Sequence, residues 1–380
     1  MLALTGIGMV SVLGLDSVTS CAAARAGIRR IVETDDLFVN DIEGDETAPV
    51  AIHRVPVVAK GFFGFARLEQ LGWYGLQDLL RKGGVDLQGR LGMILLVSDG
   101  MYEEAWFRRT REEDEEPSEE SDEDQGARAS RTRVAEELLN RLVARAGLPV
   151  APELRATLST TAVGLSAALQ TVEEWFKHGM CDCCIVGGVD SLVQPVTLAA
   201  LDGKGLLRTI ERPACMIPGE AAGFVALEKP KSAARKARVQ AIVEAPASAR
   251  EAPHPALEAQ GPDDGGLRAA IAHTLAQLPD AGRATGLVVV NLNGDDYRAS
   301  SWWRGIASSS EQVRLDALPA WYPPLFFGEI GAATGPVALA MLASGWARGY
   351  APGTNALICL LDDRGGRGTV YVRSPVEVRT

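Results

Sequence analysis

The stretch Leu158-Ser159-Thr160-Thr161-Ala162-Val163-Gly164-Leu165-Ser166 precedes a second one, Cys183-Cys184-Ile185-Val186-Gly187-Gly188-Val189-Asp190-Ser191. Small and β-branched residues before Ala162 indicate a strand, and apolar residues at helical spacing up to residue 177 indicate a helix. His178-Gly179 marks the end of this helix, and residues 183–186 read as a buried strand of a parallel sheet. A sharp turn between strand and helix presents one side chain at the helix N-terminus, where the helix dipole and backbone N–H groups favour a nucleophile.

These residues resemble the β-ketoacyl synthases of the thiolase superfamily. That family carries a motif like S-T-A-C-[ST]-S/G at the turn, and a G-D-A-D-x-x-x-A-G-G strand after a long buried helix. The matching residues are 158–162 and 179–188, in an ungapped register, and the catalytic cysteine of the family falls on Ala162. Because an alanine methyl cannot attack a thioester, the resemblance implies that this site lacks its nucleophile.

Two further motifs extend the resemblance towards the chain ends. Residues 5–14 are similar to T-G-I-G-x-[VL]-S-x-x-G, and residues 212–228 are similar to the family's segment ending in G-E-G-A-G-x-[LV]-x-L-E. The two histidines of the family lie in N-A-H-G-T and G-H-x-x-G-A-A-G, which place them on Asn293 and Glu329. In the family these imidazoles supply oxyanion donors and assist loss of carboxylate from malonyl-ACP. Asn293 retains a donor, whereas an ionised Glu329 would repel an enolate.

The resemblance therefore implies no catalytic residues, with Ala162, Asn293 and Glu329 at the vestigial triad positions. The glycine-rich gatekeeper loop of the family, G-F-G-G-T-N, is matched only loosely by residues 362–368, where charged residues replace the phenylalanine. Candidate substrate-binding residues line the old pocket and this loop: Thr160, Thr161, Gly365 and Gly366.

Buried strands alternate with amphipathic helices along the chain, which predicts an α/β fold. The resemblance specifies a thiolase fold of two similar halves, residues 1–235 and 236–380, in α-β-α-β-α layers. Segments 31–60 and 246–264 are expected to be irregular, and a helix is expected at 131–145. In thiolase-fold enzymes the strand before the turn pairs with its mate in a dimer, and residues 155–160 keep the residue types that edge pairing favours. We therefore expect a homodimer, or a heterodimer with a related thiolase-fold protein.

The composition and motifs of the sequence exclude several classes of binding partner and indicate a cellular compartment. The 380 residues carry a formal net charge of −11, which argues against a basic face for nucleic acid or anionic membranes. No apolar run reaches membrane length, and the N-terminus begins with a buried-strand pattern rather than a signal peptide, so a cytoplasmic location is expected. The spacings of nucleotide-binding glycine loops are missing, so no cofactor is expected. Cys181, Cys183 and Cys184 suggest a metal site, but alternate strand residues face opposite ways, and we expect no metal.

Residues 112–124 are almost continuously acidic, within an expected mobile insertion at about 103–130. One interpretation is a solvated loop without a role, and the other is a docking strip for a basic protein partner.

Three functions fit these observations. The first is a non-catalytic binding partner or adaptor, for a ketosynthase and its acyl carrier or as an accessory to a secretion-system effector. The second is an acyltransferase with a displaced nucleophile at Ser159, Thr160, Thr161 or Glu329. A hydroxyl there needs a neighbouring base, and none of His53, His178, His254 and His273 falls at a motif position. The third is an acyl-chain or acyl-carrier binding protein without turnover.

Overall fold

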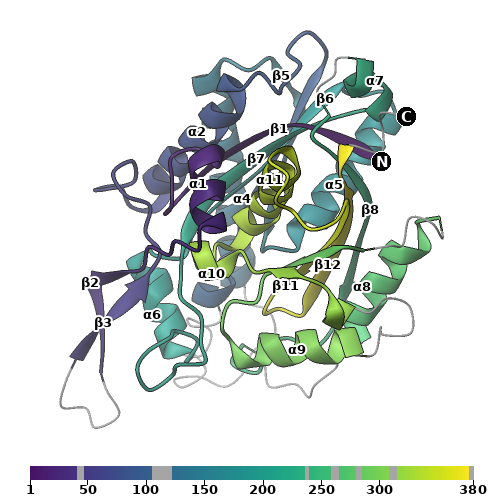
Figure 1. The fold of residues 1–380 in the computed structure, drawn as a ribbon. Helices are drawn as coiled ribbons and strands as arrows, with labels where there is room; N and C mark the ends of the chain where they lie inside the picture. The colour runs from purple at the N-terminus through teal and green to yellow at the C-terminus, as the bar shows by residue number, and fades with distance from the viewer. Residues whose placement is uncertain are drawn as a thin grey trace.

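The computed structural model describes residues 1–40, 47–104, 122–235, 239–257, 265–279, 285–307 and 315–375. Ten strands form one twisted sheet in the order β10-β9-β11-β12-β8-β1-β7-β6-β4-β5 (Figure 1). Their bounds are β1 Leu2–Ser11, β4 Leu91–Ser98, β5 Val150–Thr160, β6 Cys183–Ser191, β7 Glu220–Glu228, β8 Ala241–Arg250, β9 Leu287–Val290, β10 Ala320–Trp321, β11 Asn355–Leu361 and β12 Gly366–Arg373.

The sheet consists of two five-stranded sets with the same topology. In the first set β1, β7 and β6 are successively antiparallel, whereas β6, β4 and β5 are parallel. The second set repeats this with β8, β12 and β11 antiparallel, and β11, β9 and β10 parallel. A short antiparallel pairing of Leu2–Leu4 with Ala241–Val243 joins the two sets. The chain thus contains two similar halves.

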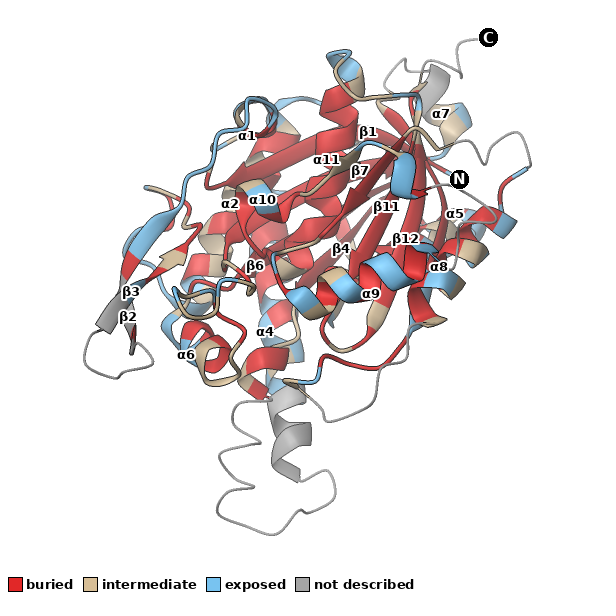
Figure 2. Ribbon diagram, turned by 60° about the horizontal axis from the view of Figure 1, so that its bottom comes forward, coloured by how far each residue is buried: buried red, intermediate tan, exposed pale blue. Residues whose placement is uncertain are grey.

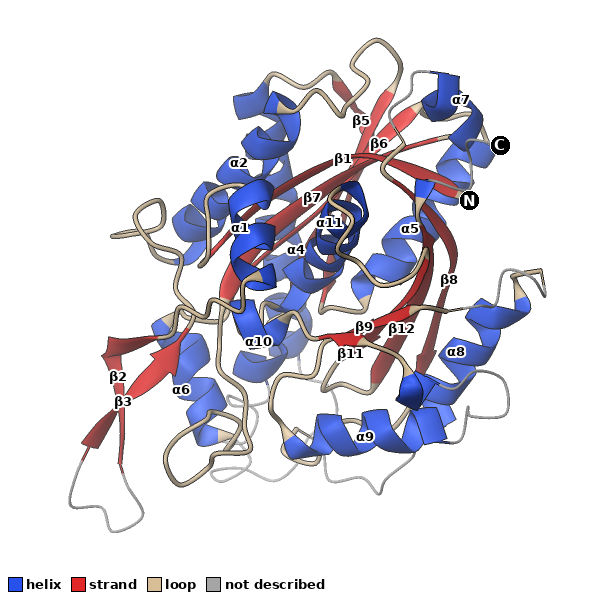
Figure 3. Cartoon of the chain, in the orientation of Figure 1, coloured by secondary structure: helices blue, strands red, loops and turns tan. Residues whose placement is uncertain are grey.

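The helices form three layers around these two strand sets (Figure 3). Helices α5 and α11 touch strands of both sets and form the central layer. Helices α2 and α4 cover the outer side of the first set, and α8, with α9 against it, covers the second. The helix bounds are α1 Ser17–Arg25, α2 Gly64–Arg81, α4 Asp122–Ala146, α5 Gly164–Lys177, α6 Pro195–Gly203, α7 Pro230–Arg235, α8 Gly265–Ala276, α9 Asp296–Ala307, α10 Pro324–Phe327 and α11 Thr334–Ala347. The expected α-β-α-β-α thiolase arrangement is confirmed.

Burial follows from the residue pattern. Every residue of β1, β6 and β7 is buried, because these strands have helices on both faces (Figure 2). Helix α11 is buried from Thr334 to Gly345, as its apolar composition predicts. Gly8 lets α2 lie directly on β1, since a Cβ there would come within 2.3 Å of the Leu79 backbone nitrogen.

Three predictions of irregular structure need correction. Segment 31–60 contains a hairpin, β2 Val32–Asn40 and β3 Thr47–Ile52, and the acidic residues of β2 interrupt the apolar alternation by which a strand is predicted. Residues 246–250 continue β8, and the helix expected at 131–145 begins at Asp122, so residues 122–130 are not a loop. The acidic residues 112–121 lie outside the described residues. No helix in the described part of the chain is long and apolar enough to cross a membrane.

Candidate functional site

Ala162 lies at the turn between β5 and α5. It is buried, and it lines a cavity of about 20 Å³ at the carboxyl ends of the parallel strands β4, β5 and β6. This space holds about one water molecule. The turn leads directly into α5, whose N-cap position is Val163 and offers no side-chain cap. The cavity is lined by Ser98, Asp99, Met101, Tyr102, Thr160, Thr161, Ala162, Asp190, Leu192, Arg298, Glu329, Gly331, Leu361 and Asp362.

Glu329 and Asn293 lie together beside this cavity. The Asn293 Nδ2 donates a hydrogen bond of 2.9 Å to Glu329 Oε2, and the Gly331 N–H donates one of 3.1 Å to Glu329 Oε1. Glu329 lines the same cavity as Ala162, whereas Asn293 reaches it only through Glu329. The amide donor of Asn293 is therefore already engaged by a carboxylate.

Arg298, which the motif analysis did not single out, completes this cluster. Its guanidinium donates to Glu329 Oε2 and, at 2.7 Å, to Asp363 Oδ1, and all three side chains are about 3% exposed. The Tyr102 hydroxyl donates to the other Asp363 oxygen at 2.8 Å. Burial opposes the charge on Arg298, but Asp363 and Glu329 outweigh it and hold its pKa well above the usual value. We call Arg298, Glu329, Asp363 and Tyr102 the buried ion-pair cluster.

The sequence held one signal for Arg298. It occupies α9 with Ser301, Trp302, Gly305 and Ile306, all buried, at the spacing of the core-facing side of a helix. A charged residue on that face requires a buried partner. The identity of that partner depends on which residues the fold places against α9 after β11. The periodicity of one helix does not predict this.

Thr161 is held by the loop that follows β11. Its hydroxyl donates to Asp362 Oδ2 at 2.5 Å, and the Gly366 N–H donates to Asp362 Oδ1 at 2.6 Å. Thr160 and Thr161 both line the cavity. Gly365 and Gly366 do not line it, and a Cβ on Gly365 would lie 2.0 Å from the Glu251 carbonyl oxygen, against the end of β8.

The same loop is tied to the first half by Arg364. Its guanidinium pairs with Glu104 and, at 3.3 Å, with Asp99. The loop at the position of the family's gate is thus fixed by three successive charged residues, Asp362, Asp363 and Arg364. The partner of Asp362 lies at the turn between β5 and α5, a partner of Asp363 lies on α9, and the partners of Arg364 follow β4.

Asp190 is the next-to-last residue of β6 and lines the cavity. Its oxygens accept hydrogen bonds from the Ser191 N–H at 2.8 Å and the Ala332 N–H at 2.9 Å. Burial raises the pKa of this carboxyl to about 8, although the two N–H donors oppose the shift. Asp190 was not identified by the motif analysis.

The four histidines lie outside this cavity. His178 is the C-cap residue of α5, and His273 lies on the exposed side of α8. His53 and His254 are buried. Burial, and then the charge of Arg29, lowers the pKa of His53 to about 4. None of them contacts Thr161, which leaves Asp362 as its hydrogen-bonded carboxylate.

Cys181, Cys183 and Cys184 are all buried at the start of β6. Among the residues with described positions, no group of three or more His, Cys, Asp and Glu side chains is arranged to hold a metal ion.

No family model matches this chain, and neither does any curated protein. Solved structures are similar to it. The ishigamide ketosynthase/chain length factor has a TM-score of 0.68 at 18% identity and covers 98% of this chain and 99% of that chain. A type II PKS acyl-carrier protein in complex with its ketosynthase bound to the hexaketide has a TM-score of 0.73 at 15% identity over 98% of both chains.

A third similar structure is the oxazolomycin ketosynthase domain of Streptomyces albus, with a TM-score of 0.71 at 16% identity, covering 98% of this chain and 75% of that chain. These identities are too low to transfer an activity, but the coverage includes almost every element. The chain has the fold of the thiolase-like ketosynthases.

Proposed function

We propose that this protein is a non-catalytic ketosynthase-like subunit that acts by binding a thiolase-fold protein. The observation that carries the proposal is the small volume of the cavity beside Ala162. Its volume is about 20 Å³, and the position of the nucleophile bears a methyl group. A cavity for one water has no room for an acyl thioester.

The hydrogen bonds around the cavity support the same conclusion. Ketosynthase chemistry needs donors aimed at a developing oxyanion. Here the Asn293 amide and the Gly331 N–H both donate to Glu329, and the Arg298 guanidinium lies between Glu329 and Asp363. An oxyanion at this place would have to displace a carboxylate that already has its partners.

The edge strand β5 supports a binding role. It ends the sheet order, and among the described strands it pairs with β4 alone, so its other edge leaves backbone groups for a partner strand. Residues 155–158 and 160 on this strand are half-buried, and Ser159 is exposed. One similar structure is described as a ketosynthase/chain length factor and another as a ketosynthase with an acyl-carrier protein, which makes a ketosynthase the partner class we propose.

The first experiment tests the absence of condensation. Purified protein and its Ala162→Cys variant are incubated with acyl and malonyl thioesters of acyl carrier protein, and released carbon dioxide is measured. We expect both to match a blank, because a thiol alone restores neither the oxyanion donors nor the space. Turnover by the unmodified protein would instead favour the displaced nucleophile, with Thr161 and Asp362 as the pair to examine.

The second experiment tests the partner. A photo-crosslinking residue replaces the exposed Ser159 on β5 in the native host, and mass spectrometry identifies the product. The matched control carries it at Ile210, which is 90% exposed between α6 and β7. We expect a second copy or another thiolase-fold protein to be captured from position 159 alone. Capture of a protein of unrelated fold, or equal capture at both positions, would refute the proposed pairing.

A further inference from the structure

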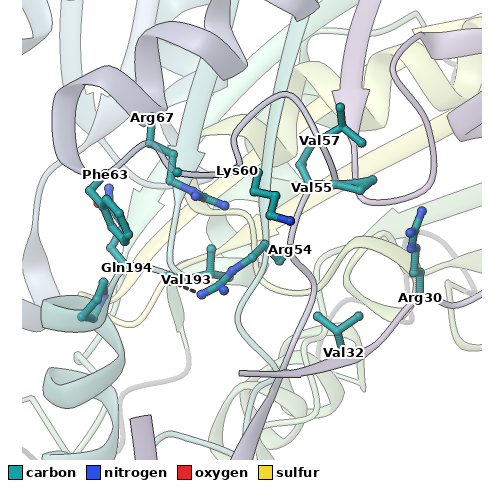
Figure 4. A pocket seen from close by; sticks show the side chains of 13 residues that line it. Arg30, Val32, Arg54, Val55, Val57, Lys60, Phe63, Arg67, Val193 and Gln194 are labelled. Carbon is teal, nitrogen blue, oxygen red and sulfur yellow. Dashed lines mark hydrogen bonds between the residues drawn. The ribbon is translucent and has the colours of Figure 1, made fainter. Parts of the chain in front are cut away.

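A second cavity lies away from the site described above. It has a volume of about 430 Å³ and shares no lining residue with the cavity at Ala162. It is formed by the start of β2, the segment between β3 and α2, and the residues that lead into α6 (Figure 4). A hollow of this size can hold a bulky side chain of another molecule.

Apolar side chains at this cavity are exposed to an unusual degree. Val57 is 77% exposed and Phe63 is 62% exposed. Exposed apolar groups gathered around a hollow indicate a binding surface, because folded proteins rarely leave such groups together in water. Val57 also has a backbone φ of 67°, which a β-branched residue rarely adopts. We call the apolar residues that line this cavity the apolar groove: Val32, Val55, Val57, Phe63 and Val193.

A buried ion pair holds one wall of the apolar groove in place. The Arg67 guanidinium in α2 donates to Glu220 in β7 at 2.5 Å and 2.6 Å. It also donates to the carbonyl oxygens of Ala59 at 2.8 Å and Phe62 at 3.0 Å. The Val55 N–H donates to Glu220 at 2.8 Å. The segment between β3 and α2 is therefore fixed before a partner arrives, which reduces the cost of ordering it on binding.

The charged residues at the groove are all basic. None of the described residues that line it is acidic. Arg67 is held by its ion pair, and Arg54 turns towards a backbone carbonyl of the wall (Figure 4), so we assign a binding role to neither. Arg30 and Lys60 are exposed at the mouth. Exposed charges at the rim of an interface add little affinity, but they select the charge of the partner and speed its association.

We propose that the apolar groove binds an acidic polypeptide segment of a partner protein, which inserts a bulky apolar side chain between Val57 and Phe63. Burial of that side chain supplies the affinity, and Arg30 and Lys60 attract the acidic residues that flank it. The net charge of −11 on the whole chain disfavours an acidic segment elsewhere on the surface. The occupant is a protein rather than a membrane, because a bilayer offers no shaped group that fills a hollow.

This surface is separate from the features that support the proposed function. The cavity has no lining residue in β5 or in the buried ion-pair cluster. The inference therefore stands whether or not the protein pairs with a thiolase-fold partner.

Phe63→Ser tests the groove without weakening the fold. Phe63 is the N-cap residue of α2 and its side chain forms no cap hydrogen bond, whereas serine is a favoured N-cap residue. The variant should therefore be at least as stable as the unmodified protein, which thermal unfolding checks. The matched control is Ile210→Ser, which removes an apolar side chain that is 90% exposed between α6 and β7.

The probe is a phage-displayed library of random peptides. The library first passes over immobilised Phe63→Ser, which removes peptides that bind elsewhere, and is then selected on the unmodified full chain. We expect the enriched peptides to combine Asp and Glu with one bulky apolar residue. Fluorescence anisotropy should show about thirtyfold weaker binding to Phe63→Ser, as for a central aromatic residue of an interface, and unchanged binding to Ile210→Ser. The loss caused by Lys60→Glu should shrink as the salt concentration rises.

Four results would overturn the proposal. In the first, no peptide is enriched on the unmodified chain. In the second, the enriched peptides show no excess of acidic residues. In the third, they bind Phe63→Ser as tightly as Ile210→Ser. In the fourth, the chain sediments with vesicles of phosphatidylcholine and phosphatidylserine and Phe63→Ser does not, which would assign this surface to a membrane.

Discussion

Replacing Arg298 by leucine tests whether the buried ion-pair cluster closes the site. Arg298 is the cation between Glu329 and Asp363, and the side chains of all three are about 3% exposed. The substitution leaves two buried carboxylates, Glu329 and Asp363, with no opposite charge between them. Breaking a buried pair in this way lowers the free energy of unfolding by about 3–5 kcal/mol, because neither water nor an opposite charge then stabilises the remaining buried charge.

The loss should depend on pH with a definite sign. Burial would raise the pKa of Asp363, but Arg298 holds it below its usual value; without Arg298 the pKa of this carboxyl should rise above the unfolded value. Such groups stabilise the fold when protonated, and this contribution is lost as the pH rises through the folded-state pKa. We therefore expect Arg298→Leu to be closer to wild type at about pH 5 than at about pH 8. The triple variant Arg298→Leu/Glu329→Gln/Asp363→Asn removes the uncompensated charges and should recover part of the loss.

The assay is urea unfolding followed by tryptophan fluorescence at both pH values. The control is Arg90→Leu, which breaks an exposed pair with Asp182 whose side chains are 59% and 47% exposed. Surface pairs of this kind contribute about 0–1 kcal/mol. If Arg298→Leu costs no more than Arg90→Leu, water reaches the cluster, and the argument from a closed cavity fails.

Two further predictions concern single residues. Burial raises the pKa of Asp190 to about 8 from its ordinary value of 3.8, so the stability it gives is complete at low pH and is lost as the pH rises through about 8. Carboxyl carbon NMR should show this titration, and a midpoint below about pH 5 would contradict it. Val57→Gly should raise the unfolding midpoint, since glycine accepts a φ of 67° without strain and relief is worth about 1 kcal/mol net of the added chain entropy. A lower midpoint would mean that the valine side chain contributes more by packing than its backbone costs.

The order of the central elements could be predicted from sequence because their patterns are local. The strand, turn and helix around Ala162 and the buried strand of residues 183–186 each show in a few consecutive residues, and the family motif set their register. The hairpin β2–β3 was missed because Glu33, Asp35 and Asp36 interrupt the apolar alternation of its strand. The start of helix α4 was predicted several residues too far along the chain. Its first residues are polar, so they show no apolar periodicity from which a helix could be predicted.

The candidate site could be predicted only by position. The register of the motifs placed Glu329 and Asn293 near Ala162. It treated each of them as a single residue in the place of a histidine and did not predict the partners with which they form hydrogen bonds. Their partners come from distant parts of the chain: Arg298 from α9, Asp363 from the end of β11 and Tyr102 from the segment after β4. Tertiary pairing of charges separated by many residues has no periodicity, so sequence reasoning found one side of the cluster and missed the other.

The placement of carboxylates around the cavity is the reason why we expect one restored thiol to be insufficient for catalysis. Three of these carboxylates accept a hydrogen bond from a backbone N–H group: Asp190 from Ala332, Glu329 from Gly331 and Asp362 from Gly366. Acyl-transfer sites keep such N–H groups available, because the donors must meet charge that develops on the substrate. Here the protein satisfies these donors with its own side chains, and Arg298 neutralises Glu329 at the wall and Asp363 behind it. Recovering chemistry would require removal of several carboxylates together, and each single removal leaves a buried donor or charge without its partner. The cavity is therefore stable as an internally paired core, which suits a subunit that contributes a surface rather than a reaction.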